Sequence, residues 1–319
     1  MEKSYVVGVD IGGQSTKIGI VNRRGDIVAQ TVITSKYSAS EGEVFMDSVC
    51  DTIISLAKGV GLENIQGIGI GAPNGNFYTG CIAFAPNLPW AKDTAVPLKE
   101  YIEKKLGGQI PVSVTNDANA AAIGEMTYGV AKGMKNFIMI TLGTGVGSGI
   151  IINGDLVYGH DGFAGELGHA RVVKNNGRLC GCGRTGCLEA YASAIGLART
   201  AREWLGSGKY PESLLNEIED ITSKDVYEAA VKGDQMALDL FNYTGTILGE
   251  AFSNFVAFSA PEAIVVFGGL ARAGEFIFKP MRDALNANVL SIWKDKVAVL
   301  PSALKESDAA ILGASALAW

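Results

Sequence analysis

The fold of this chain is decided by residues 5–21, YVVGVDIGGQSTKIGIV. Two apolar, β-branched runs, 5–9 and 17–21, enclose a glycine turn, and a third run at 27–33 follows a polar turn. This pattern predicts a hairpin and a third strand, with Asp10 at the end of the first strand. Backbone N–H groups exposed by a glycine turn suit phosphate oxygens, although a plain hairpin with a solvated aspartate fits the same residues.

The pattern returns at residues 137–152, FIMITLGTGVGSGIII. Predicted strands at 137–142 and 148–152 enclose the glycine turn 143–147. Two strand–turn–strand units at the starts of two halves predict an internal duplication. The two turns could face each other across a cleft and hold one polyphosphate from both sides. The chain has no Walker loop, so these turns are the candidates for a phosphate site.

The rest of the chain alternates predicted strands with predicted helices, which indicates an α/β fold. Strands are predicted at 65–71, 110–115, 263–267 and 297–300. Helices are predicted at 43–60, 98–106, 120–130, 190–206, 222–232, 234–259, 274–290 and 307–319.

Several connections between these elements have both a structural and a functional interpretation. Asp117 follows a strand and starts a helix, where it could cap the helix or serve a ligand at the carboxyl edge of a parallel sheet. Asn87, in the proline-containing loop 82–90, is either a turn former or a contact for a hydroxylated ligand. Gly268 and Gly269 follow strand 263–267 and form either a βα turn or a platform for a flat ligand such as adenine.

Residues 165–189, GELGHARVVKNNGRLCGCGRTGCLE, hold three of the five cysteines and one of the two histidines. Thiolate and imidazole ligands with glycines between them favour a structural zinc site. Its ligands would be His169, Cys180, Cys182 and Cys187. A C-x-C pair is too cramped for a disulfide, while buried structural cysteines are the other interpretation. Residues 181–186 also match G-x-G-x-x-G, but no strand precedes them, so a dinucleotide loop is rejected.

The composition describes a compact globular protein. The chain has 319 residues, 48% of them hydrophobic and 19% charged, and its net charge is −6. This length suits two domains, and the absence of a basic run argues against a nucleic-acid partner. No apolar run reaches the ~18 residues of a membrane span, and the start of the chain lacks a signal-peptide pattern. The sequence therefore predicts a cytoplasmic enzyme without a membrane partner.

These motifs resemble the ROK family of sugar kinases and repressors, within the actin-like, hexokinase-like ATPase fold. Residues 10–17 are similar to the first phosphate motif of the family, residues 142–147 to the second, and Gly268-Gly269 to the adenosine motif. The family signature, which is the most specific match, is similar to residues 165–169 and 180–189. The resemblance covers essentially the whole chain. It implies a two-domain α/β fold, ribonuclease H-like, with an internal duplication.

The resemblance also implies the roles of the site residues. Asp117 is expected to be the catalytic base. Sugar contacts are expected from Gly75, Asn87, Asn116, Asp117, Glu166, His169 and Glu189. ATP with Mg²⁺ is expected at Asp10, Gly12, Gly13, Thr16, Lys17, Gly143, Thr144, Gly145, Gly268 and Gly269. As a zinc ligand, His169 would also join the metal to the sugar pocket. The turn 72–75 departs from the family pattern by an inserted Asn74, next to the expected contact at Gly75.

The predicted function is that of an ATP-dependent hexose kinase acting on the primary 6-hydroxyl, with glucose as the first expectation. The alternatives are family kinases for fructose, mannose, N-acetylmannosamine or N-acetylglucosamine, and a sugar sensor without turnover. Family repressors carry an N-terminal DNA-binding domain, and the first strand begins here at Tyr5, which favours a kinase. We expect a small domain of residues 1–117 completed by helix 305–319 and a large zinc-carrying domain of residues 118–304. From the resemblance we also expect a homodimer or a higher homo-oligomer.

Overall fold

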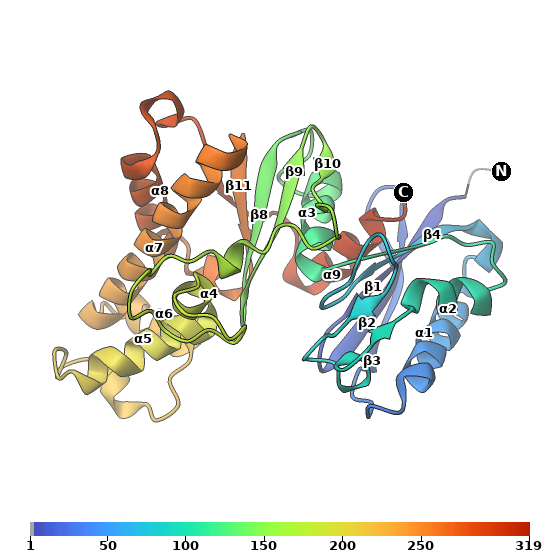
Figure 1. The fold of residues 1–319 in the computed structure, drawn as a ribbon, viewed down its shortest axis with the longest axis horizontal. Coiled ribbons are helices and arrows are strands. Elements are labelled where there is room, and N and C mark those ends of the chain that lie inside the picture. Colours follow the sequence, from blue (N-terminus) through green and yellow to red (C-terminus); the bar gives the residue numbers. More distant parts are fainter. Residues whose placement is uncertain (1–2) are drawn as a thin grey trace.

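The computed structural model describes residues 3–319, which form two α/β lobes (Figure 1). The first lobe is built on a five-stranded sheet in the order β3-β2-β1-β4-β7. Its strands are β1 (Tyr5–Ile11), β2 (Ser15–Asn22), β3 (Ile27–Thr34), β4 (Ile65–Gly71) and β7 (Val112–Thr115). Strand β1 pairs antiparallel with β2, which confirms the predicted hairpin and places Asp10 opposite Lys17.

Helices cover both faces of the first sheet. Helices α1 (Gly42–Ala57) and α2 (Leu98–Lys105) share one apolar core with its strands. Helix α9 (Glu306–Ala316) returns from the C-terminal end of the chain to the opposite face. A Cβ atom on Gly8 would lie 2.2 Å from the carbonyl oxygen of Ile311. Glycine in β1 therefore allows α9 to approach the sheet closely.

The second lobe repeats this architecture. Its five-stranded sheet has the order β10-β9-β8-β11-β12, the same arrangement as in the first sheet. The strands are β8 (Phe137–Leu142), β9 (Val146–Ile152), β10 (Asp155–Leu156), β11 (Ala263–Phe267) and β12 (Ala298–Pro301). The shared strand order confirms the predicted internal duplication.

Helix α3 (Asp117–Tyr128) covers one face of the second sheet, and α7 (Gln235–Ser259) with α8 (Glu275–Asn288) covers the other. The remaining elements lie in the connections. They are β5 (Ile82–Ala83), β6 (Ala95–Val96), α4 (Glu189–Ala192), α5 (Ala194–Gly206), α6 (Ser223–Val231) and the short 3₁₀ turns Leu62–Asn64, Pro89–Ala91, Leu167–His169, Leu214–Glu217, Gly269–Ala273 and Ser291–Trp293. None of the helices within residues 3–319 combines the length and apolar character needed to cross a membrane.

The structure corrects two local expectations. The single helix predicted over 190–206 is two helices, because Ser193 has an extended backbone and its side chain accepts a hydrogen bond from the N–H of Gly196. Asn116, rather than Asp117, caps α3, since its side chain accepts the N–H of Asn119 at 2.7 Å. A serine or an asparagine that offers its side-chain oxygen to the backbone breaks or begins a helix in this way.

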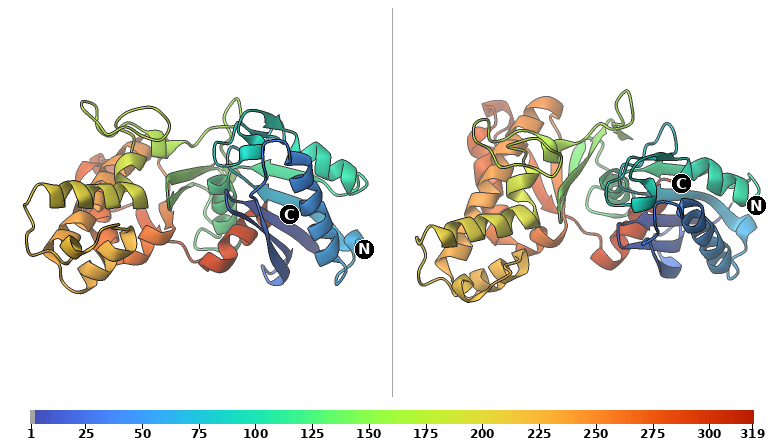
Figure 2. Two further views of the ribbon diagram at one scale, coloured as in Figure 1. Left: turned by 90° about the horizontal axis from the view of Figure 1, so that it is seen from below. Right: turned by 60° about the horizontal axis from the view of Figure 1, so that its bottom comes forward.

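Helices α3 and α9 lie side by side between the two lobes (Figure 2). They cross at Gly124 and Gly313, where a Cβ atom on Gly124 would lie 2.7 Å from the Cα atom of Gly313. The chain passes between the lobes at the β7–α3 and β12–α9 connections. This crossing is therefore the natural pivot for movement between the lobes. The domain limits at residues 117 and 305 stay a prediction.

Candidate functional site

A cleft of about 880 Å³ lies between the lobes and gathers most of the predicted site residues. The predicted sugar contacts that line it are Asn87, Asn116, Asp117, Glu166, His169 and Glu189. Both glycine motifs of the second lobe also line it, with Gly143, Thr144, Gly145, Gly268 and Gly269. Such a volume falls within the range of small-ligand sites in proteins. The cleft thus joins a wall of hydrogen-bonding side chains to a glycine-rich floor.

Asp117 lies at the first turn of α3, directly after strand β7. Its Oδ1 accepts the N–H of Ala118 at 2.8 Å, which holds the carboxylate at the end of the sheet. The surrounding cleft walls raise the pKa of Asp117 by desolvation, and the backbone hydrogen bond opposes this rise. The residue is nevertheless exposed in the open cleft, where a ligand can reach its carboxylate oxygens. An ionised carboxylate at this position can accept a proton.

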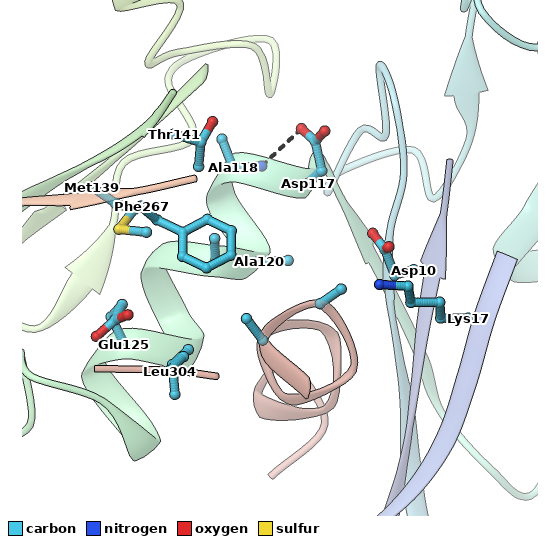
Figure 3. Close-up of a pocket in the computed structure, with 13 residues that line it drawn as sticks. Asp10, Lys17, Asp117, Ala118, Ala120, Glu125, Met139, Thr141, Phe267 and Leu304 are labelled. Carbon is cyan, nitrogen blue, oxygen red and sulfur yellow. Dashed lines mark hydrogen bonds between the residues drawn. The ribbon is translucent and has the colours of Figure 1, made fainter. Parts of the chain in front are cut away.

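A second, smaller cavity of about 260 Å³ extends behind Asp117 (Figure 3). Figure 3 shows Asp117 on one side and Asp10 with Lys17 on the other. Burial, together with the negative charge of Asp117, raises the pKa of Asp10 to about 6, whereas Lys17 lowers it. Three carboxylate residues, Asp10, Asp117 and Glu125, line this cavity with one ammonium group. The pair Asp10 and Asp117 is the kind of setting that suits a metal-bound polyphosphate.

The glycine turn of the second lobe contacts Glu189 directly. The Oε2 atom of Glu189 accepts the N–H of Val146 at 3.0 Å. A Cβ atom on Gly145 would lie 2.4 Å from the same oxygen, so a side chain there would displace the Glu189 carboxylate. The Oε1 atom lies 3.5 Å from Sγ of Cys180. Glu189 therefore links the turn to the cysteine cluster, a connection that sequence spacing did not indicate.

The four predicted zinc ligands converge. The ligand atoms of His169, Cys180, Cys182 and Cys187 all lie within 4.8 Å of one another. The Cys182–Cys187 Sγ distance and the distance from Cys180 Sγ to His169 Nδ1 are both 3.7 Å. Tetrahedral ligands about 2.3 Å from one zinc ion would lie roughly 3.8 Å apart. The donor set therefore fits zinc, and no disulfide joins these sulfurs.

His169 faces both the cluster and the cleft. Its Nδ1 atom points to Cys180, while its Nε2 atom lies 3.9 Å from Oε2 of Glu166. Desolvation raises the pKa of Glu166, an effect that His169 opposes. If Nδ1 binds a metal ion, the Nε2 N–H remains available to the cleft as a hydrogen-bond donor.

Four predicted ligand contacts line neither the cleft nor the smaller cavity. The Thr16 hydroxyl is fully buried and hydrogen bonds to Ser35 at 2.7 Å, so it is not available to a ligand. Gly75 packs against the carbonyl oxygen of Thr115, which a Cβ atom would approach to 2.3 Å. Its neighbours Pro73 and Asn74 line the cleft instead. Gly12 and Gly13 lie in the β1–β2 turn.

Ser148 is a cleft residue that the sequence interpretation missed. Ser148 lies in β9, is 2% exposed, and donates its hydroxyl to the carbonyl oxygen of Gly165. It also accepts the N–H of Leu167 at 3.1 Å. Ser148 therefore holds the backbone on both sides of Glu166. The available signal was a lone hydroxyl residue within an otherwise apolar and glycine-rich strand.

Two lobes of equal strand order around one cleft define the two-domain actin-like ATPase fold. A family model described as the ROK family matches residues 6–319. The chain therefore belongs to the ROK family.

Relatives within this family differ in function. The chain is 38% identical to the glucokinase of Halalkalibacterium halodurans, over 91% of this chain and 88% of that protein. It is 29% identical to the xylose repressor of Bacillus subtilis, over 98% of this chain and 76% of the repressor. Its fold is similar to a solved ROK family glucokinase from Streptomyces griseus in complex with glucose and AMPPNP, with a TM-score of 0.79 and 34% identity over 98% of both chains.

Proposed function

We propose that this protein is an ATP-dependent hexose kinase that phosphorylates the primary 6-hydroxyl, with glucose as its substrate. The observation that carries the proposal is the position of Asp117. It lines the cleft together with the polar wall formed by Asn116, Glu166 and Glu189, and it also lines the smaller cavity that holds Asp10 and Lys17. The glucokinase relative and the solved glucokinase with glucose and AMPPNP support the same assignment.

In this proposal Asp117 accepts the proton of the hydroxyl group that attacks the γ-phosphoryl group. Phosphoryl transfer depends mainly on alignment and charge stabilisation. A positioned base typically adds a further ~10²–10⁴-fold to the rate. Asp10 and Lys17 would hold the metal-bound phosphates, while the turns at Gly143–Gly145 and Gly268-Gly269 would offer backbone N–H groups and space for the nucleotide. Bound Mg²⁺ would neutralise charge on the phosphates.

The polar wall would recognise the sugar. Carboxylate oxygens accept two hydroxyl hydrogen bonds each, and a ligand that lacks those hydroxyls leaves them unpaired in the cleft. Glu166, Glu189 and the Nε2 N–H of His169 would supply hydrogen-bonding groups, and Asn87 and Asn116 line the same cleft. A zinc ion held by the His169 and cysteine cluster would fix the orientation of the His169 ring.

The variant D117N tests this assignment. We expect it to lose more than nine-tenths of the ADP release with glucose, on the order of the general-base contribution, yet to bind glucose with unchanged affinity. Coupled ADP release with a panel of hexoses gives the activity, and calorimetry gives the binding. If D117N keeps more than a tenth of the wild-type rate of ADP release, Asp117 is not the catalytic base.

The sugar panel also separates the alternatives. Faster turnover of fructose, mannose, N-acetylmannosamine or N-acetylglucosamine than of glucose would change the assigned substrate but keep the assigned kinase activity. The similarity to a xylose repressor favours one different class, a sugar sensor without turnover. Binding of a sugar without ADP release from any member of the panel would establish that class.

A further inference from the structure

The lobes touch at a place remote in sequence from the α3–α9 pivot. A turn of the first lobe, residues 76–80, meets a loop of the second lobe, residues 158–165, which we call the strap. The Phe77 and Tyr158 rings stack with centroids 4.0 Å apart. The Tyr78 hydroxyl donates to the carbonyl oxygen of Gly159 at 2.9 Å. This contact joins the lobes beside the cleft wall that carries Asn74.

Asn76 is the centre of the contact. Its side chain is 3% exposed, and its Nδ2 donates to the carbonyl oxygen of Asp161 at 2.6 Å. The Oδ1 atom accepts the N–H groups of Tyr78 and Thr79 within its own turn, at 3.0 and 3.1 Å. One planar amide therefore organises the first-lobe turn with its oxygen and holds the second lobe with its nitrogen. An aspartate could perform only the first task, because a carboxylate has no donor.

The strap is followed directly in the chain by Glu166 of the polar wall. The backbone of the strap has positive φ at three glycines, Gly159, Gly162 and Gly165. Other residues adopt this conformation only with backbone strain. A Cβ atom on Gly162 would lie 2.6 Å from Nδ2 of Asn76, which explains the glycine at the contact itself. At its inner end Ser148 bonds to Gly165, and the next residue is Glu166. The strap therefore connects its contact with the first lobe to a carboxylate of the cleft.

We propose that Asn76 is a positioning residue for sugar binding, because it ties the strap to the first lobe and thereby sets the place of Glu166. The inference rests on the proposed function, in which Glu166 holds a sugar hydroxyl. Asn76 belongs to none of the sequence motifs, and it does not itself line the cleft. The first lobe then controls a sugar contact that belongs to the second.

The variant N76D tests the inference with little change of shape. The oxygen that holds residues 78 and 79 is kept, while the donor to Asp161 is replaced by an acceptor that repels the carbonyl oxygen. Loss of one such hydrogen bond should weaken glucose binding by about fivefold, measured by calorimetry, and raise the glucose KM more than it lowers kcat. Hydrogen exchange should become faster within residues 158–167 and stay unchanged in α3.

Two tyrosine variants provide a matched pair. Y78F removes the hydroxyl that bonds to Gly159 across the lobes, whereas Y101F removes one that bonds to Asp47 at 2.8 Å within the first lobe. We expect Y78F to speed exchange in the strap and Y101F to leave it unchanged. Because Y78F keeps the ring and its stacking, it serves even if N76D does not fold.

The outcomes separate this inference from the proposed kinase activity. Two results would overturn the positioning role of Asn76. One is a hydrogen-exchange rate in the strap of Y78F equal to that of the wild type. The other is faster strap exchange in N76D with unchanged glucose affinity. Failure of the wild-type protein to phosphorylate any hexose would reject the kinase alone, because exchange and calorimetry need no turnover. A fivefold loss of sugar affinity with faster strap exchange would support the role in either case.

Discussion

At the scale of single residues, the site concentrates negative charge that the fold would otherwise avoid. Asp10 and Asp117 face one cavity. Burial and the charge of Asp117 raise the pKa of Asp10, and burial raises the pKa of Asp117. Lys17 only partly compensates. Such an arrangement is costly for stability and useful for binding a metal-bound phosphate, which brings positive charge.

The stability of the protein should therefore depend on pH through Asp10. Its pKa of about 6 lies above the ordinary value of 3.8, so the folded state holds the proton more tightly than the unfolded chain. The stabilising contribution is present below about pH 4 and is lost as the pH rises through about 6. We expect D10N to exceed wild type by about 1–3 kcal/mol at pH 8 and to match it at pH 4, in urea unfolding.

The exposed carboxylate of Asp220 provides a control for this measurement. D220N should follow the wild-type curve at both pH values, since the residue does not line either cavity. A D10N protein less stable than wild type at pH 8 would show that the charge attraction of Lys17 outweighs the cost of burying the Asp10 charge. We also expect D10N to lose activity, because the proposed phosphate site needs the carboxylate.

At the scale of elements, two connections decide how the site is held. One is the cysteine cluster, whose backbone spans 169–187 with few regular elements. Loops of this kind gain their order from metal ligation, since thiolate binding is coupled to local folding. The other is the α3–α9 crossing, where glycines replace side chains at the contact.

Removing the metal should affect sugar binding before nucleotide binding. We expect C182S to lower the zinc content and raise the glucose KM, because His169 and the backbone near Glu166 lose their anchor. C81S is the matched control, since Cys81 is partly exposed and lies outside the cluster. Zinc is measured by mass spectrometry of the native protein. An unchanged glucose KM in zinc-free C182S would break the proposed link between metal and sugar pocket.

The helix crossing predicts a distinct effect for alanine. A Cβ atom on Gly124 would meet the backbone of Gly313 at 2.7 Å, so G124A should destabilise the protein by about 1–3 kcal/mol despite its higher helix propensity. Gly206 in α5 has no atom within 4 Å of its Cβ position. G206A should therefore leave stability equal or raise it by up to about 1 kcal/mol. Thermal and urea unfolding compare the two variants, and equal stability would exclude the tight crossing.

At the scale of the whole molecule, the open cleft implies a movement. The lobes are joined at the pivot of α3 and α9 and at the strap, and the cleft between them admits water. Closure on the substrate would exclude that water and limit wasteful ATP hydrolysis. We expect such a closure to turn about the α3–α9 crossing and to be limited by the strap.

Closure can be measured directly. Saturating glucose with a non-hydrolysable ATP analogue should reduce the radius of gyration in solution scattering and protect the cleft loops from protease. Lactose, whose second ring should not fit within the closed lobes, serves as a control sugar. Equal scattering and equal cutting with and without glucose would reject closure.

Much of this protein follows from its sequence alone. Local periodicity, turn chemistry and short spacing determine the strand and helix positions, both glycine turns and the convergence of four metal-type ligands. These features need only neighbouring residues, so the chain specifies them directly.

Other features were decided only by the tertiary structure. They include the burial of Thr16, the packing of Gly75 on Thr115, and the bond of Glu189 to Val146. Asn76 and Asp161 meet although 85 positions separate them. Each depends on how the two lobes pack and which way a side chain turns, because partners distant in the chain are selected by geometry and burial rather than by local pattern.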